Sequence, residues 1–437
     1  MIPLPVRNPP APPPATLALA YLTVSATAFV LAALALPTLS AELTGHYYHT
    51  RLLALTHVVA LGWITLAIMG ASYQMIPVAI ERPLWSVRLA QGQLLALTAG
   101  IAGMVGHFWT GRWAGLPWAA GLVGLGALSH VVNVALTLRG LPRWSFTARG
   151  VALGLAGLTL TVGFGMTLAA THGRDVFPGG ILSAVQAHFH LALLGWITPV
   201  ILGVAARVYP MFLLAPEPGG LGGRVQLWGL GLGVPAVVAG LLLGQAALLI
   251  AGATVVAASL AVHAAWVVNF ARHRKRPALD WGLRFVLTGT ACLAPAAGLG
   301  LVILLRPGGA PGLVIPYAVV ALGGWVSLTI VGMMLKIVPF LVWYRVYAPR
   351  AGREPVPVVA QLTWPAVERL AYVLLAGGTL ALALAISSGS RPAVAAASVA
   401  VASGSVVFAV ALGRTLLHVL PGPGRRLAPS PVAAAPR

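Results

Sequence analysis

The chain has 437 residues, of which 59% are hydrophobic and only 8% are charged. This composition excludes a soluble globular protein, because a soluble core cannot cover so many long apolar segments. The net charge of +20 does not indicate nucleic-acid binding, because most basic residues fall in alternate loops, as the positive-inside rule requires. The single cysteine, Cys292, excludes an internal disulfide.

Apolar runs of spanning length recur along the chain and predict an all-α, polytopic membrane protein with about twelve transmembrane helices. The runs are 15–37, 50–78, 88–109, 115–138, 149–171, 181–213, 226–245, 247–271, 283–306, 313–344, 367–386 and 392–420. The Pro-rich segment 1–14 and the tail 421–437 are predicted to be disordered, on either side of a single membrane domain, 15–420. The basic residues place both termini in the cytoplasm of a prokaryotic cell, with the chain in its inner membrane.

Three of the predicted helices carry copies of one motif, in which a Gly-Trp pair is followed by proline fourteen residues after the tryptophan. The tryptophans are Trp63, Trp196 and Trp325, and each interval between them holds four predicted helices. Each copy also has a hydroxyl residue two positions after the tryptophan and glycine seven positions after it. We therefore predict three parallel four-helix pseudo-repeats. The predicted repeats are 15–140, 149–272 and 283–420.

Histidines interrupt the apolar sequence of two copies. His57 and His190 each lie six residues before the tryptophan, and His188 precedes His190 by two residues. A histidine in lipid is unfavourable without a partner, and residues two apart on a helix point about 200° apart. His188 and His190 therefore fit two different partners or two adjacent cofactors. Neutral imidazole binding the iron of one or two b-type haems is the favoured hypothesis, and hydrogen bonding between helices is the alternative.

Other metals are expected to be less suited to this chain. Its seven acidic residues all fall in predicted loops or at helix ends, which disfavours carboxylate-bridged metals within the membrane. His46 and His49, before the second helix, could share a face and bind copper, although an aromatic cap at the membrane interface fits this segment better. Copper is therefore not favoured, and no catalytic residue is assigned.

His130 and His263 are separated by the same interval as two of the tryptophans, on the fourth helix of two repeats. Their expected role is hydrogen bonding between helices, with Asn133 or Asn269 as candidate partners. They are therefore weaker candidates for a functional site.

Three polar residues, Gln74, Arg207 and Lys336, lie eleven positions after the three tryptophans, near the predicted inner ends of their helices. The favoured interpretation is that Arg207 and Lys336 extend to the cytoplasmic interface. The alternative is a polar cluster or proton entry at the inner mouth of the bundle.

The segment from His188 to Trp196, His-Phe-His-Leu-Ala-Leu-Leu-Gly-Trp, resembles the tenth helix of subunit I in C-family (cbb-type) haem–copper oxidases and nitric oxide reductases. Twelve helices in three arcs are similar to the same superfamily, and the chain also resembles the NnrS membrane proteins. The resemblance implies that His188 holds a reactive haem and His190 an electron-transfer haem. It leaves open whether His57 is the second ligand of the electron-transfer haem or lies beside His188.

The chain departs from the oxidase pattern at the copper site. Its His-x-His lies on predicted helix six rather than ten, where Val319 occupies the matching position. Predicted helix seven, 226–245, has no histidine, and the chain has no His-Pro-x-x-Tyr motif. We therefore expect no oxygen reduction by the isolated subunit.

The sequence thus predicts a haem b-binding membrane protein that acts in electron transfer or in binding a diatomic gas such as nitric oxide. Candidate partners are cytochrome c or quinol, other membrane subunits and further copies of the chain. The alternatives are a haem-free transporter or structural subunit, and a terminal oxygen or nitric oxide reductase with an unusual metal site.

Overall fold

The structure, a computed structural model, describes residues 14–216, 220–276, 278–306 and 310–420. Within these ranges the chain is helical, with no β-strand and one isolated bridge between Ala351 and Glu354. Twelve helices in the described ranges are long and apolar enough to cross a membrane, which confirms an all-α, polytopic membrane fold. The ends predicted to be disordered, 1–14 and 421–437, lie outside the described residues except for Pro14.

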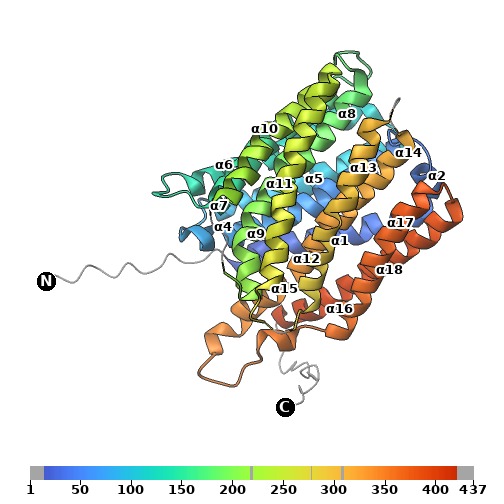
Figure 1. The fold of residues 1–437 in the computed structure, drawn as a ribbon. Coiled ribbons are helices and arrows are strands. Elements are labelled where there is room, and N and C mark those ends of the chain that lie inside the picture. Colours follow the sequence, from blue (N-terminus) through green and yellow to red (C-terminus); the bar gives the residue numbers. More distant parts are fainter. Residues whose placement is uncertain (1–13, 217–219, 277, 307–309, 421–437) are drawn as a thin grey trace.

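The spans fall into three successive units of four, and several spans are built from more than one helical segment (Figure 1). Unit 1 contains α1 (Ala15–Ala35), η1 (Leu36–Leu39), α2 (Ser40–Leu43), α3 (Thr50–His57), η2 (Val58–Thr65), α4 (Leu66–Ile80), α5 (Val87–Thr110), η3 (Trp113–Gly115) and α6 (Leu116–Leu138). Unit 2 contains α7 (Phe146–Ala170), α8 (Gly180–His190), η4 (Leu191–Ile197), α9 (Thr198–Leu213), α10 (Leu221–Leu243) and α11 (Ala246–Arg272). Unit 3 contains α12 (Trp281–Ala291), α13 (Leu293–Leu305), α14 (Pro311–Ala318), η5 (Val319–Ser327), α15 (Leu328–Val346), η6 (Ala348–Arg350), η7 (Val359–Leu362), α16 (Pro365–Tyr372), η8 (Val373–Gly377), α17 (Gly378–Ser387), α18 (Arg391–Leu416) and η9 (Leu417–Val419).

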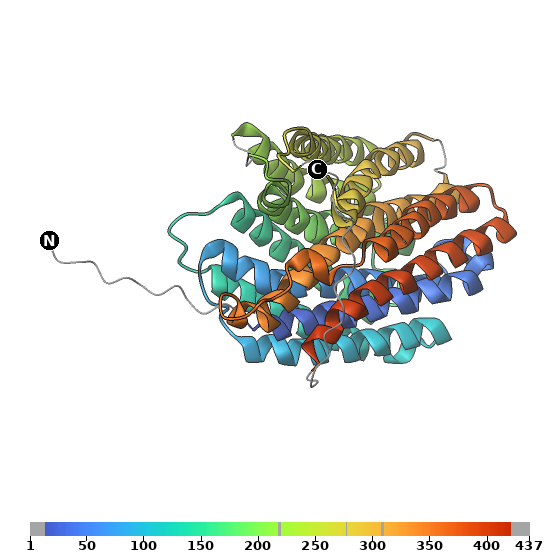
Figure 2. The same cartoon turned by 90° about the horizontal axis from the view of Figure 1, so that it is seen from below.

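The second span of each unit, which carries the Gly-Trp motif, lies at the centre of the bundle. The buried share of the most apolar stretch is 56% in Thr50–Ile80, 83% in Gly180–Leu213 and 78% in Pro311–Val346. In each of the other spans it is at most 50%. The units form a closed ring, since α6 packs against α7, α11 against α12, and α18 against α1 (Figure 2). Side chains from different units therefore meet around one central axis.

Each central helix contains a π-helical segment that includes its Gly-Trp pair, namely η2, η4 and η5. Hydroxyl groups satisfy carbonyls in two of them: Thr198 donates to the Leu193 carbonyl and Ser327 to the Leu322 carbonyl, each at 2.7 Å. Each acceptor lies five residues back, which matches the wider turn of a π-helix. Such segments are rare and are frequent at functional sites. Two of the three begin directly after a histidine that the sequence singles out.

Hydrogen bonds between units explain two of the hydroxyl residues that lie two positions after a tryptophan, Thr65 and Ser327. Trp63 Nε1 donates to Ser327 Oγ at 3.0 Å, and Trp196 Nε1 donates to Thr65 Oγ1 at 3.2 Å. All four side chains are buried at the centre of the bundle. Polar contacts of this kind hold transmembrane helices together where the hydrophobic effect between helices is weak.

The glycine seven positions after each tryptophan permits close packing of two helices. In each unit this glycine lies against the first helix of the same unit, where an added Cβ would collide or be tightly confined. The contacts are Gly70 with Tyr21, Gly203 with Gly150 and Gly332 with Gly282. Small residues at such contacts let helix backbones approach closely in a membrane.

Candidate functional site

A large, mostly apolar cavity of about 1170 Å³ surrounds α8 and η4. This volume exceeds the range of about 300–1,000 Å³ that is typical of small-molecule sites. The first lobe of the cavity is lined by α3, α5, α6 and α7 and contains His57 and His188. The second lobe is lined by α10, α11, α13 and α14 and contains His190 and Tyr317. The cavity therefore holds all three histidines that the sequence predicts as haem ligands.

His57 and His190 are oriented by the same backbone contact. Nδ1 of His57 lies 2.7 Å from the Leu53 carbonyl oxygen, and Nδ1 of His190 lies 2.8 Å from that of Gln186. A carbonyl can only accept, so both neutral rings carry their proton on Nδ1 and keep a lone pair on Nε2. Metal-ligating histidines commonly have their tautomer and ring orientation fixed by such a bond.

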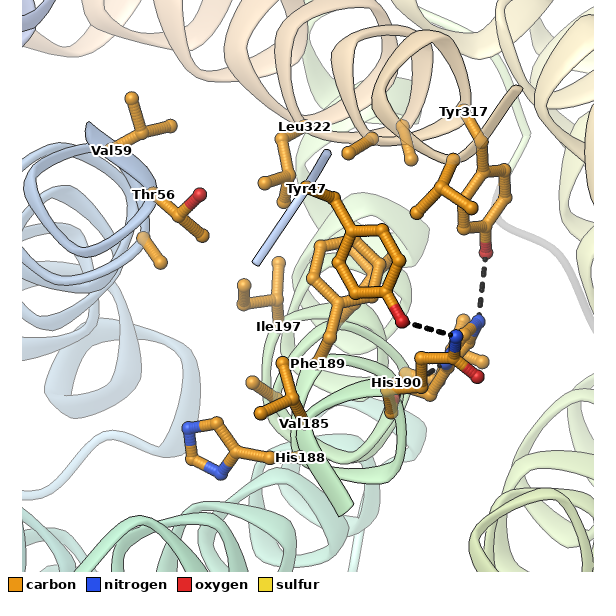
Figure 3. Close-up of a pocket in the computed structure, with 18 of the residues that line it drawn as sticks. Tyr47, Thr56, Val59, Val185, His188, Phe189, His190, Ile197, Tyr317 and Leu322 are labelled. Atoms are coloured by element: carbon orange, nitrogen blue, oxygen red, sulfur yellow. Dashed lines mark hydrogen bonds between the residues drawn. The ribbon is translucent and has the colours of Figure 1, made fainter. Parts of the chain in front are cut away.

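His188 leaves α8 on the side opposite His190 (Figure 3) and lies beside Gly165 of α7. His57 and His188 both line this part of the cavity. Nδ1 of His188 is buried and has no hydrogen-bond partner among the described residues. Leaving such a group unpaired typically costs about 1–3 kcal/mol. The first lobe therefore brings together two imidazoles from different units, one of which lacks the partner that its burial demands.

Small and aromatic residues shape the first lobe around these rings. The Phe108 ring stacks on His57 with centroids 4.8 Å apart. An added Cβ at Gly165 of α7 would lie 2.9 Å from His188 Cε1, so glycine leaves the space that this ring occupies. Neither residue stands out in the sequence, because the contacts of both cross between helices.

His190 faces Tyr317 of α14 in the second lobe. The Tyr317 hydroxyl oxygen lies 3.3 Å from His190 Nε2, and the two rings stack with centroids 5.8 Å apart (Figure 3). Because the proton of His190 is on Nδ1, the tyrosine hydroxyl is the donor. His190 is therefore satisfied at both ring nitrogens, whereas His188 is not.

Tyr47, in the connection before α3, approaches the face of α8 that carries Gln186 and His190. Its hydroxyl oxygen accepts a hydrogen bond from Gln186 Nε2 at 2.9 Å (Figure 3). Burial raises the pKa of the Tyr47 phenol, and the hydrogen bond from Gln186 opposes this only in part. The phenol is therefore neutral at physiological pH and can keep this contact.

The contacts between central helices follow the repeat. Two positions of each copy line the cavity, eight and six residues before the tryptophan. The earlier position holds Leu55, His188 and Tyr317, and the later one holds His57, His190 and Val319. The later residue of unit 2 contacts the earlier residue of unit 3, as His190 does with Tyr317. The repeat gives His57 and His188 the same relation between units 1 and 2. Sequence reasoning missed Tyr317, although its distance from its tryptophan equals that of His188.

His46 and His49 serve the local backbone in the described structure. Nδ1 of His46 accepts from the Tyr48 backbone N–H at 3.1 Å, and Nδ1 of His49 accepts from the Arg51 N–H at 3.3 Å. His49 thereby caps the N-terminus of α3. The His46 ring stacks on Tyr47, with centroids 4.5 Å apart. Nδ1 of each ring therefore already accepts a hydrogen bond from the backbone.

His130 and His263 are buried. His130 Nδ1 has no hydrogen-bond partner in the described part of the chain, and the interhelical hydrogen bonding expected for the two histidines stays a prediction. Asn133 instead bonds the backbone of Ser86, accepting from its N–H at 3.0 Å and donating to its carbonyl at 2.8 Å. Aromatic rings of α4 and η4 surround His130, with centroids 5.0 and 6.0 Å away. Within the described ranges no hydrogen bond joins His263 to Asn269.

The helix ends that carry Gln74, Arg207 and Lys336 differ between units. Lys336 Nζ lies 2.5 Å from Asp280 Oδ2, which also pairs with Arg276 at 3.4 Å. The Lys336 side chain is only 15% exposed and forms this ion pair at the N-terminal end of α12. That Arg207 and Lys336 extend to the cytoplasmic interface stays a prediction. Arg207 is exposed, whereas Gln74 is buried and its Oε1 has no hydrogen-bond partner in the described part of the chain. The ion pair could have been predicted from the sequence, because Asp280 is an acidic residue at the start of a predicted helix and directly follows a basic loop.

No group of three or more His, Cys, Asp or Glu side chains among the described residues could hold a metal ion. A cofactor held by one or two imidazoles does not need such a group. No protein-family model matches the chain, and no curated protein matches it in sequence.

Proposed function

We propose that the protein binds haem b in the first lobe, with His57 and His188 as the two axial ligands. The observation that carries this proposal is the presence of two imidazoles from separate units in the lining of one large apolar cavity. Both rings have nitrogens that bond to no other side chain in the described structure, which is the condition for binding iron. Interhelical hydrogen bonding explains these histidines less well, because His188 lacks such a bond.

Electron transfer is the role that this ligand set supports best. Two protein ligands leave no open axial position on the iron, so a gas would have no direct access to it. When bound, the haem would supply one-electron redox chemistry. The contribution of the chain would be to orient His57 through the Leu53 carbonyl, to raise the basicity of its Nε2 and to exclude water with the apolar lining.

The setting that we propose is the inner membrane of a prokaryotic cell, with both termini in the cytoplasm. The uneven distribution of basic residues between alternate loops supports this orientation. Kinship with haem–copper oxidase subunit I is supported by the His-x-His motif and by the three four-helix units. Cytochrome c or quinol, other membrane subunits and further copies of the chain are the proposed partners.

Binding of a diatomic gas such as nitric oxide is the second candidate function. It requires a haem with one protein ligand and one open axial position. His190 favours this candidate, because it faces the second lobe without another histidine opposite it.

The visible spectrum of the protein purified from a haem-replete host tests the main proposal. We expect a Soret band and, on reduction, the sharp α-band of a six-coordinate b-type haem. The matching measurement is the haem-to-protein ratio, which we expect to be about one. A protein without a Soret band would instead support a haem-free transporter or structural subunit.

A further inference from the structure

The third and fourth spans of each unit pack against each other in one antiparallel register. In every unit, an added Cβ on one glycine of the third span would lie 2.9–3.1 Å from Cγ2 of one valine on the fourth. Such contacts place the two helix backbones close together. The pairs are Gly100 with Val123, Gly233 with Val256 and Gly378 with Val401.

A step of seven residues along both helices, which is about two turns, leads from these contacts to a second set of corresponding positions. All of the residues at these positions are buried. They are Gln93 and His130 in unit 1, Gln226 and His263 in unit 2, and Ala371 and Phe408 in unit 3. Two units therefore have an amide and an imidazole where the third has apolar side chains.

In unit 1 the central helix supplies partners for the amide. The Tyr73 hydroxyl donates to Gln93 Oε1, and Gln93 Nε2 donates to Met69 Sδ at 3.0 Å. The Tyr73 ring also packs edge-on against His130, with centroids 5.0 Å apart. Tyr73 therefore lies against both members of the pair and satisfies the glutamine.

In unit 2 the central helix supplies no such partner. The residues that correspond to Met69 and Tyr73 are Leu202 and Ala206, whose side chains cannot form hydrogen bonds. Gln226 is 0% exposed, and neither its Nε2 nor its Oε1 has a hydrogen-bond partner in the described part of the chain. Because both atoms are unpaired, exchanging the amide nitrogen and oxygen would not satisfy the group. A buried amide is strongly unfavourable in this state.

Polar groups of α11 lie at the level of Gln226. His263 is only 3% exposed and faces Gln226 in the register described above. Ser259, one turn before His263, donates to the Val255 carbonyl at 3.0 Å, and its Oγ lies 3.5 Å from the Val225 carbonyl oxygen. The α10–α11 contact therefore offers an amide, an imidazole and a hydroxyl oxygen close to one another.

We propose that Gln226 and His263 bind ordered water between α10 and α11. Water both donates and accepts, so it can satisfy the amide and reach the imidazole in place of the tyrosine of unit 1. Buried water typically makes about three hydrogen bonds to buried polar groups that otherwise lack partners. The hydrogen bonding between helices that the sequence predicts for His263 then runs through this water. Neither residue lines the cavity around α8, so the inference does not depend on haem binding.

Solid-state NMR of the full-length protein in lipid bilayers tests this directly. Side-chain amides of glutamine are labelled with ¹⁵N, and magnetisation is transferred from water at short mixing times. We expect transfer to the Gln226 amide and none to the Gln93 amide, which is the matched control because Tyr73 and Met69 are its partners. Spectra of Gln226→Met and Gln93→Met assign the two signals.

A second measurement compares the thermal unfolding midpoints of Gln226→Met, His263→Phe and the double variant, which makes the pair apolar as in unit 3. If water joins the two side chains, each single change leaves the network incomplete and should lower the midpoint. The double variant should then lose less than the two single losses together, because the two groups act as one unit.

Three results would overturn the inference. The first is an absence of transfer from water to Gln226, or equal transfer to Gln226 and Gln93. The second is a higher midpoint in Gln226→Met, which would show that the amide is unpaired in the folded protein. The third is a double variant whose loss equals the sum of the single losses. Protein purified without haem would overturn the first-lobe proposal and leave this test unchanged.

Discussion

The two lobes lie on either side of α8 and contain residues from the same repeat positions, but the side chains at these positions differ in chemistry. The first lobe contains His57 and His188, whose Nδ1 lacks a partner, and in the second His190 contacts Tyr317, which satisfies it. The residue eight positions before the tryptophan of the next unit makes this difference. The motif therefore positions a histidine, and the neighbouring unit decides what that histidine can bind.

The largest expected effect separates the histidines of the two lobes. His188→Ala should abolish the resting haem, and His57→Ala should abolish it or convert a six-coordinate spectrum to a five-coordinate one, because each removes one axial ligand. His190→Ala should retain the full spectrum. The absorption spectrum and haem-to-protein ratio measure this, with His273→Ala as control, since His273 is exposed and bonds the Asn269 carbonyl. Loss of haem in His190→Ala with retention in His188→Ala would reverse our assignment of the lobes.

A second prediction perturbs only the space around His188. In Gly165→Ala the new methyl group would lie 2.9 Å from His188 Cε1, so the ring must rotate. We expect haem affinity to fall on the order of tenfold, as for other changes beside a metal ligand. Haem titration of the depleted protein measures this. Gly163→Ala is a matched control on the same helix, because nothing lies within 4 Å of its added Cβ. Equal affinities in both variants would show that His188 is not a ligand.

A third prediction concerns the bonds that hold the central helices together. Thr65→Val removes the acceptor of Trp196 and loosens units 1 and 2, which form the first lobe. Ser327→Ala removes the acceptor of Trp63 and loosens units 1 and 3 instead. Each should lower the free energy of unfolding by about 0.6 kcal/mol, the average for hydrogen bonds between membrane helices. Thermal unfolding, followed together with haem release, tests this prediction. We expect only Thr65→Val to weaken haem retention. Equal haem release from the two variants would contradict the prediction.

The smallest expected effect is at the outer edge of the second lobe. Tyr47→Phe removes the acceptor of Gln186 and should lower the free energy of unfolding by about 0.5–1.5 kcal/mol. Because burial raises the pKa of Tyr47, the folded state resists ionisation of the phenol. The advantage of the wild type should therefore be constant below the ordinary tyrosine pKa of about 10 and shrink as pH rises through the raised value.

Unfolding measured from pH 7 to 11 tests this prediction. Tyr48→Phe is the control, because burial also raises the pKa of Tyr48 but no hydrogen bond of its hydroxyl is present in the described structure. A wild-type advantage that grows with pH would contradict the expected sign.

The sequence by itself determined the membrane fold, the number of spans and the threefold repeat. These features depend on the length of apolar runs and on spacing along one helix, both of which are local. The same spacing indicated that His188 and His190 point in opposite directions, which the structure bears out (Figure 3). Three of the four histidines that line the cavity, His57, His188 and His190, were therefore identifiable from the chain alone, whereas His172 was not.

Only the tertiary structure decided which groups meet. It placed His57 and His188 in the lining of one cavity, and it brought Tyr317 to His190. It also bonded Asn133 to the backbone of α5 and its cap instead of to His130. Such pairings depend on the rotation of each helix about its axis and on π-helical segments that shift side chains around it. Neither is encoded in the spacing of residues along a single helix, because both follow from packing against the neighbouring units.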